Sequence, residues 1–173
     1  MRAILCGVCA LFALTSVAAA QESRSRTNAK PVTVEFKNTE GQSVGSAQLT
    51  SAPKGVKITL DVKNLPPGEH SIHIHQVAKC DPPDFKTAGP HFSPGGAEHS
   101  HEGMPAGDIP NFALIVGADG TAHVSVVAPN VTLGDDDHSV FSNGGTAIVI
   151  HAVAGGTGTA APARIACGII TKP

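Results

Sequence analysis

The stretch that decides the fold is HSIHIH, residues 70–75, in which polar and apolar residues alternate from Ser71 to His75. Successive side chains of a strand point to opposite faces of a sheet. The two isoleucines are therefore expected in a core, and His73 and His75 together on the other face. Two imidazoles on one rigid strand make half of a metal site, and imidazole binds copper, zinc, iron and nickel. Taken alone, the pair is equally compatible with a polar strand surface that happens to contain histidine.

The same two-residue period continues on both sides of this stretch. Residues 32–36 and 56–62 alternate apolar and polar side chains, as half-buried strands do. Turns are expected at 38–42 and at 118–120, where glycine allows a positive φ. No long helical period is present. The sequence predicts an all-β, antiparallel barrel or sandwich, with eight strands at 32–36, 44–50, 56–62, 70–77, 111–116, 122–127, 147–153 and 164–170.

Composition agrees with many short strands joined by turns. The 173 residues include 19 glycines and 13 prolines, neither tryptophan nor tyrosine, and only 15% charged side chains. The length suits one domain with its own core. The net charge of −2 gives no reason to expect nucleic acid or an anionic membrane as a partner.

The first twenty residues have the pattern of a secretory signal peptide. Arg2 is followed by a mostly apolar run over 4–17 and by small residues for cleavage near Ala20. The run is too short for a stable membrane span. Residues 21–31 are a polar, disordered lead-in, and 32–173 form the folded domain. The mature chain is expected to be exported, either periplasmic or secreted.

Cleavage of the signal leaves two cysteines, Cys80 and Cys167. Two cysteines in an exported protein most often pair, the alternative being two unrelated thiols. A bridge would close a loop of almost half the chain. In the chain-entropy description, that closure contributes about 4–5 kcal/mol to stability as an upper figure.

Histidine is concentrated in one part of the chain. Six of the nine histidines lie from His70 to His101, and residues 79–110 form a long loop with little periodicity. Loops of this length in a compact domain are usually functional or disordered. His91 lies in a stiff Gly-Pro context, and His151 ends the apolar run 148–150. These histidines favour a metal site over a plain polar surface.

The order of these motifs resembles the copper/zinc superoxide dismutase family. The matching segments are HSIHIH (70–75), GPHFSP (89–94), Gly107-Asp108, His151 and RIACG (164–168). Each motif is weak alone, but five in the family's order are specific, and the resemblance spans about 32–170. It implies an eight-stranded antiparallel Greek-key β-barrel, an immunoglobulin-like sandwich with long metal-site loops over one face.

The resemblance also implies roles for individual residues. The activity is conversion of superoxide to dioxygen and hydrogen peroxide, by a monomer or homodimer. Arg164 docks the superoxide anion, and His91 bridges copper to zinc and takes up a proton. His70 is a hydrogen-bonding residue, while His123 and His138 match no ligand position and are expected on the surface. The implied copper ligands are His73, His75, His91 and His151, and the disulfide joins Cys80 to Cys167.

The zinc half of the pattern is incomplete. The family places three histidines and one aspartate on zinc, and His91, His99 and Asp108 match. The third histidine is expected three residues before the aspartate, where this chain has Pro105, which cannot be a ligand. His101, Glu102 or a water could replace it, or the site could be empty.

The loop after His151 also differs from the family pattern. An acidic residue expected four positions on is Gly155 here, and 155–162 carries no charge. Both departures resemble the copper-only branch of the family. Three readings remain: a copper-dependent superoxide dismutase, with zinc helpful or absent; a non-catalytic protein that buffers or delivers copper; and a structural domain without metal. Retention of Arg164 favours the enzyme, because copper storage needs no anion-docking arginine.

Overall fold

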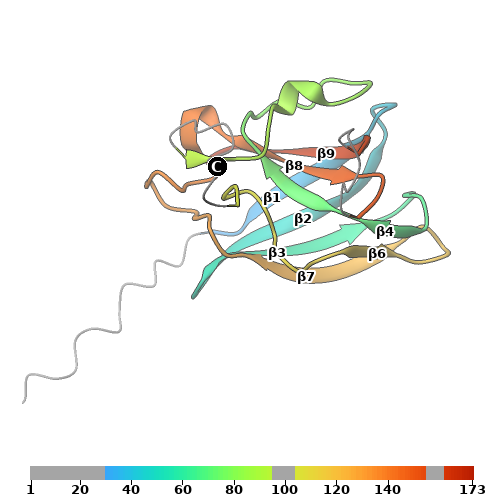
Figure 1. Cartoon of the computed structure of the whole chain (residues 1–173), viewed down its shortest axis with the longest axis horizontal. Coiled ribbons are helices and arrows are strands. Elements are labelled where there is room, and N and C mark those ends of the chain that lie inside the picture. Colours follow the sequence, from blue (N-terminus) through green and yellow to red (C-terminus); the bar gives the residue numbers. More distant parts are fainter. Residues whose placement is uncertain (1–29, 95–103, 155–161) are drawn as a thin grey trace, which may run out of the picture.

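The structure, a computed structural model, describes residues 30–94, 104–154 and 162–173. Figure 1 shows strands throughout, with only short helical turns between them. The strands are β1 (Val32–Asn38), β2 (Ser43–Ala52), β3 (Gly55–Val62), β4 (Gly68–His70), β5 (Ile72–His75), β6 (Leu114–Val116), β7 (Ala122–Ala128), β8 (Thr146–His151) and β9 (Arg164–Ile170), and two 3-10 turns are η1 (Lys86–Ala88) and η3 (Ser142–Gly144).

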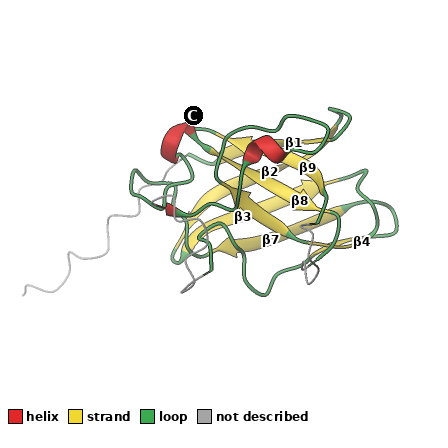
Figure 2. Cartoon of the chain, turned by 45° about the horizontal axis from the view of Figure 1, so that its top comes forward, coloured by secondary structure: helices red, strands yellow, loops and turns green. Residues whose placement is uncertain are grey.

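Seven strands form one antiparallel sheet in the order β5-β8-β9-β1-β2-β3-β7, and β4 pairs with β6 in a separate ribbon. The sheet curls around a core, as Figure 2 shows. Neighbours such as β9 and β1 are far apart in the chain, so long connections cross the ends of the sheet. The predicted all-β antiparallel fold is confirmed.

The predicted strand 70–77 is two strands, β4 and β5, so the described part of the chain has nine strands where eight were predicted. His70 pairs with Leu114 of β6, whereas Ile72 pairs with Ile150 of β8. The chain changes partner at Ser71 and so passes from the ribbon to the sheet. His70, Ser71 and Ile72 are all buried, so burial does not alternate where the chain changes partner. No glycine or proline interrupts the sequence at this point, so the break was not predicted.

The predicted strand 111–116 is also shorter than expected. Asn111 has a φ of 57°, in the left-handed region that a strand cannot contain. Pairing with β4 begins only at Leu114. The predicted strand 147–153 also ends early: β8 stops at His151, one residue after its register with β9 shifts.

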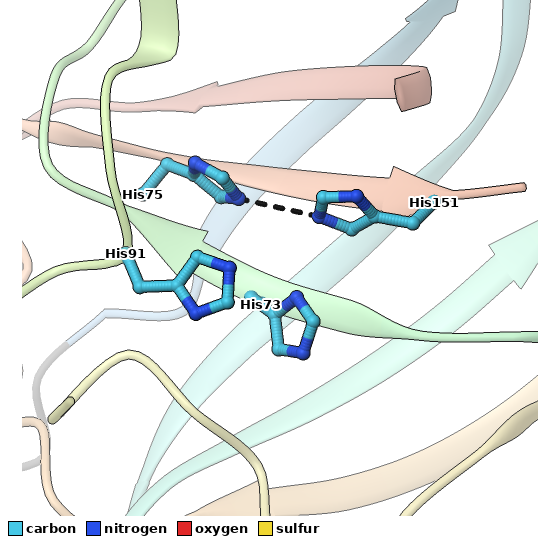
Figure 3. A group of neighbouring side chains, drawn as sticks. All are labelled: His73, His75, His91 and His151. Atoms are coloured by element: carbon cyan, nitrogen blue, oxygen red, sulfur yellow. Dashed lines mark hydrogen bonds between the residues drawn. The ribbon is translucent and has the colours of Figure 1, made fainter. Parts of the chain in front are cut away.

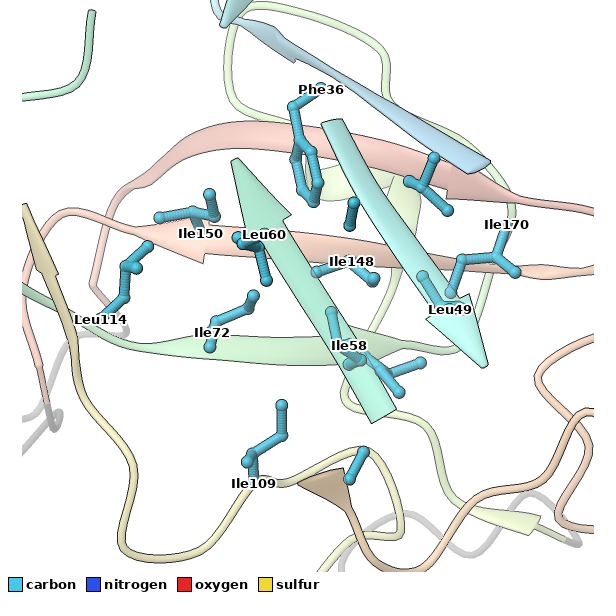
Figure 4. Close-up of a cluster of buried hydrophobic side chains, with 14 of the residues drawn as sticks. Phe36, Leu49, Ile58, Leu60, Ile72, Ile109, Leu114, Ile148, Ile150 and Ile170 are labelled. Atoms are coloured by element: carbon cyan, nitrogen blue, oxygen red, sulfur yellow. The ribbon is translucent and has the colours of Figure 1, made fainter. Parts of the chain in front are cut away.

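The core is built from the apolar residues of the alternating strands. On β1 and β3 every second side chain is buried, as the period predicts. Ile72 and Ile74 also enter this cluster, and Figure 4 shows Ile72 among its neighbours. Burial of a large aliphatic side chain contributes roughly 1.5–3 kcal/mol. The largest fully buried members include Phe36, Leu49, Ile58, Leu60, Ile72, Ile74, Leu114, Ile148, Ile150 and Ile170.

A second, smaller apolar cluster lies on the outer face of β8. The segment around η1 packs there, so that all six residues of β8 are buried. Cys80 and Cys167 form a disulfide with Cα atoms 5.7 Å apart, as predicted. The first half of the long loop is thus fixed to the sheet. The cluster consists of Phe85, Ala88, Ala147, Val149 and Cys167, with Cys80 partly buried against it.

In the described ranges, no helix is long and apolar enough to span a membrane. The predicted signal peptide, 1–20, and nearly all of the predicted lead-in lie outside the described residues.

Candidate metal centre

Four histidines from three parts of the chain converge beside β5 and β8. His73 and His75 come from β5, His151 ends β8, and His91 follows η1. Figure 3 shows the four rings turned toward one another. One nitrogen from each lies within 4.8 Å of the others. The structure therefore brings together all four residues predicted as copper ligands.

Backbone pairing places the loop histidine against the strand. Phe92 N–H donates to the Ile74 carbonyl at 2.8 Å, and Ile74 N–H donates to the Gly107 carbonyl at 2.9 Å. Gly107 N–H in turn donates to the Phe92 carbonyl. A Cβ on Gly107 would lie 2.1 Å from the Ile74 oxygen, so this close approach requires glycine. The loop carrying His91 is thereby fixed to the edge of β5.

Outer hydrogen bonds decide which nitrogen of each ring remains free. The Nδ1 atoms of His75 and His151 face the carbonyl oxygens of Gly89, at 2.8 Å, and Pro162, at 3.2 Å. A carbonyl can only accept, so each Nδ1 carries the hydrogen and each Nε2 is left with its lone pair. His91 Nδ1 lies 2.6 Å from Asp108 Oδ1, with the same result. His75 Nε2 and His151 Nε2 are 3.3 Å apart.

His73 presents the opposite nitrogen. Its Nδ1 is the one side-chain nitrogen or oxygen that is buried without a hydrogen-bond partner in the described parts of the chain. An unpartnered buried polar atom costs about 1–3 kcal/mol, so native structures rarely keep one without a use. The available donor set is therefore three Nε2 atoms and one Nδ1 atom.

The site favours neutral imidazoles. Burial, reinforced by the neighbouring His91 and His151, lowers the pKa of His73 to about 4. Burial lowers the pKa of His75 to about 2 and that of His151 to about 4. Near neutral pH these rings are uncharged, which is the form that binds metal.

These residues fit a metal ion of the imidazole-binding kind. Bonds of about 2 Å place two nitrogens on one ion up to about 4 Å apart, so closure of the cluster needs shifts below about 1 Å. His75 and His151 are buried, whereas His73 and His91 are partly exposed. The His73 and His91 side of the cluster is therefore the side nearer to solvent.

Arg164 begins β9 directly opposite His151 in the β8–β9 register. Its Nη1 donates to the Phe85 carbonyl at 2.7 Å and its Nη2 to the Gly89 carbonyl at 2.9 Å. The same Gly89 oxygen accepts from His75. Desolvation by burial lowers the pKa of Arg164, and the nearby Asp84 carboxylate opposes that effect. A half-buried guanidinium, a ready ligand for a small anion, thus lies beside the cluster.

Asp108 contacts His91 directly. The separation of 2.6 Å is shorter than the roughly 3.3 Å expected between two ligands of one tetrahedral zinc with bonds of about 2 Å. Pro105 opens the turn that leads to Asp108, whose N–H donates to the Pro105 carbonyl. The other predicted zinc residues, His99, His101 and the alternative Glu102, lie outside the described residues.

The remaining histidines are placed as predicted. His70 is buried, with Nδ1 2.8 Å from the His151 carbonyl oxygen and Nε2 2.7 Å from that of Pro66. His123 and His138 are exposed. Sequence reasoning missed two features, the contact of Asp108 with His91 and the carbonyls of Phe85 and Gly89 that hold Arg164. No local pattern marks a backbone carbonyl as an acceptor for a side chain about 75–80 residues away.

Fold and site together define a class: an antiparallel β protein whose curled sheet carries a four-imidazole metal centre beside an arginine. The profile described as copper/zinc superoxide dismutase (SODC) matches residues 43–170, about three quarters of the chain. The chain belongs to the copper/zinc superoxide dismutase family, as its motifs suggest. The family's metals are copper and zinc, and the four-histidine cluster offers ligands suited to both.

Relatives agree with this assignment. Cu-Zn superoxide dismutase 2 of Aquifex aeolicus is 42% identical over 149 residues, covering 79% of this chain and 84% of that protein. The superoxide dismutase-like protein YojM of Bacillus subtilis is 34% identical over 151 residues, covering 79% of this chain and 74% of its own length.

Solved structures have the same fold. A mutant of a superoxide dismutase-like protein from Bacillus subtilis, with one proline replaced by histidine, matches with a TM-score of 0.71 and 34% identity. The match covers 81% of this chain and 97% of that one. The Cu/Zn superoxide dismutase from Brucella abortus gives a TM-score of 0.63 at 28% identity, covering 82% of this chain and 99% of that structure.

Proposed function

We propose that this chain is an exported, copper-dependent superoxide dismutase, converting two superoxide anions and two protons to dioxygen and hydrogen peroxide. Membership of the family and relatives named as superoxide dismutases at 34–42% identity support an oxidoreductase of this kind. The predicted signal peptide supports export to a periplasm or to the outside of the cell.

The observation that carries the proposal is the unpartnered Nδ1 of His73 within the four-nitrogen cluster. The proposed copper ligands are that atom and the Nε2 atoms of His75, His91 and His151. Bound copper supplies the one-electron couple that superoxide disproportionation needs and that zinc lacks. Arg164, opposite His151, binds the anion by charge and hydrogen bonds.

The other residues orient these groups. Asp108 accepts the Nδ1 hydrogen of His91 and so keeps the Nε2 lone pair directed at the cluster. The Gly89 carbonyl does the same for His75. The direct contact of Asp108 with His91, together with Pro105 at a family histidine position, supports a copper-only site with zinc absent or weakly held at His91, His99, Asp108 and His101.

A second function has a specific observation in its favour. The zinc side is incomplete, and one relative is named only as superoxide dismutase-like. A protein that buffers or delivers copper would need the four histidines but not the anion-binding arginine. Arg164 therefore separates the two functions.

The test is to express the chain from Gln21, load it with copper and zinc, and measure metal content alongside superoxide dismutation. One copper, little zinc and fast dismutation are expected. Arg164→Ala should keep its copper and lose about 10-fold or more in rate, because it lacks local attraction for the anion. Lys57→Ala removes an exposed positive charge on β3 and serves as the control. Copper binding without dismutation in the unaltered protein would leave the buffering function.

A further inference from the structure

We propose that Phe85 is a positioning residue for Arg164, holding the guanidinium at the mouth of the metal centre through its backbone carbonyl. This inference rests on the proposed function, because it assigns Arg164 to anion binding. Phe85 is not among the residues that the family motifs identify in this sequence, and it lies in the long loop over 79–110.

Within the described residues, the guanidinium donates two hydrogen bonds, and both go to backbone oxygens of one short segment. Nη1 donates to Phe85 at 2.7 Å and Nη2 to Gly89 at 2.9 Å. The turn η1 (Lys86–Ala88) lies between the two acceptors. Because the acceptors are carbonyls, their positions depend on where the backbone of 85–89 is held, and not on the chemistry of a side chain at the contact.

The Phe85 ring is what holds that backbone. It is 1% exposed, in the cluster with Val149 of β8 and the disulfide cysteine Cys167. Its φ of 52° is in the left-handed region, which bulky residues rarely adopt. Such a conformation persists only when its surroundings fix it, and burial of an aromatic ring supplies that constraint.

The same segment also contacts the metal centre. The Gly89 carbonyl accepts from Arg164 and from His75 Nδ1, while the Phe85 carbonyl accepts from Arg164 and from Ala88 N–H. The segment 85–89 thus links the arginine to one histidine of the cluster. Loss of the ring should release the backbone at Phe85, whereas the Gly89 carbonyl should stay hydrogen-bonded to His75 Nδ1.

The first measurement is made on the metal-free protein and needs no activity. Phenylglyoxal modifies arginine side chains. Peptide mapping then gives the modification rate of Arg164 separately from those of the other arginines of the chain. Phe85→Ala should raise the modification rate of Arg164 about 10-fold, the effect of losing roughly one net hydrogen bond. Phe85→Leu keeps an apolar anchor and should stay within about 2-fold of the unaltered protein. Phe36→Ala makes the same deletion in the main core and should leave the Arg164 rate unchanged.

The second measurement is the dismutation rate per bound copper. Phe85→Ala should lower it about 10-fold, the lower end of the range for a lost outer support. In the Arg164→Ala background the same change should have little further effect, since the two residues act as one unit. If Phe85→Ala does not fold, Phe85→Gly takes its place in both measurements, because glycine lacks the ring and adopts a φ of 52° without strain.

An unchanged Arg164 modification rate in folded Phe85→Ala would overturn the inference. It would also be overturned if Phe85→Ala lowered the dismutation rate as much in the Arg164→Ala background as in the unaltered protein. Absence of dismutation in the copper-loaded unaltered protein would contradict the proposed function instead. The phenylglyoxal measurement would still decide whether Phe85 holds Arg164.

Discussion

At the residue scale, the centre depends on which nitrogen of each imidazole is left free. Carbonyls occupy Nδ1 of His75 and His151, and a carboxylate occupies Nδ1 of His91. His73 has no such partner and presents Nδ1. The tautomers are thus set before metal arrives, which reduces the ordering cost of binding.

The buried histidines predict how stability varies with pH in the metal-free protein. The folded-state pKa values of His73 and His151 are about 4, below the ordinary value of 6.5. A lowered folded pKa means that the unfolded chain binds protons first, so stability is full above about pH 6.5 and falls as pH drops toward about 4. Urea unfolding from pH 8 to pH 4 measures this fall.

The matched comparison is a variant in which His73 and His151 are both replaced by glutamine. It should show a shallower loss over the same pH window, because two of the groups that take up protons on unfolding are gone. An identical pH dependence in the variant would contradict this explanation.

The contact of Asp108 with His91 gives a second prediction at this scale. Asp108→Asn replaces a charged acceptor by a neutral one, so His91 is held less firmly and is a weaker ligand. Copper affinity should fall about 10- to 100-fold, the usual effect of losing an outer partner of a ligating histidine. Competition with a chelator of known affinity measures it.

Asp135→Asn is the matched control for that prediction, because Asp135 is exposed and pairs with Lys172 away from the cluster. Its copper affinity should equal that of the unaltered protein. A fall in both variants would indicate an effect of net charge and not of the contact with His91.

At the scale of elements, β5 serves the core and the site together. Its isoleucines are buried in the main cluster, its histidines face the metal centre, and its exposed edge receives the backbone of the loop at Phe92 and Gly107. A four-residue strand can do this because its period of two separates the faces and its backbone groups remain free for pairing.

Gly107 tests that junction. Gly107→Ala would place a Cβ 2.1 Å from the Ile74 oxygen and 2.9 Å from Phe92 N, so backbone must move. Stability should fall by about 3 kcal/mol or more, in the range for steric damage to a core. Gly41→Ala is the control, with φ of 80° and no atom within 4 Å of the new Cβ. It should cost only about 1–2 kcal/mol, for the left-handed conformation, as denaturant unfolding of both variants will measure.

At the scale of the whole molecule, the long loop and the sheet are joined twice. The disulfide ties Cys80 to Cys167 over 87 residues. The Phe85 cluster buries the outer face of β8 beside it. Loss of either link would loosen the loop that carries His91 and the carbonyls that hold Arg164.

Removal of the disulfide should lower stability more than activity of the folded molecules. Replacing both cysteines by serine should cost about 2–5 kcal/mol of unfolding free energy, as for native disulfides in small exported domains. Urea unfolding of the variant, and of the unaltered protein with and without reductant, measures it. Equal midpoints with and without reductant would show that the bridge contributes nothing to stability.

The sequence by itself determined the features that neighbouring residues encode. Alternation over 32–36 and 56–62 predicted half-buried strands, and the order of HSIHIH, GPHFSP and RIACG predicted the family and the four clustered histidines. The tertiary structure alone decided where 70–77 changes partner, which nitrogen of each ring is free, and that Asp108 lies against His91. It also placed Phe85 under Arg164, 79 residues away. Side-chain periodicity is local and survives in sequence, whereas these contacts depend on how packing brings distant backbone together.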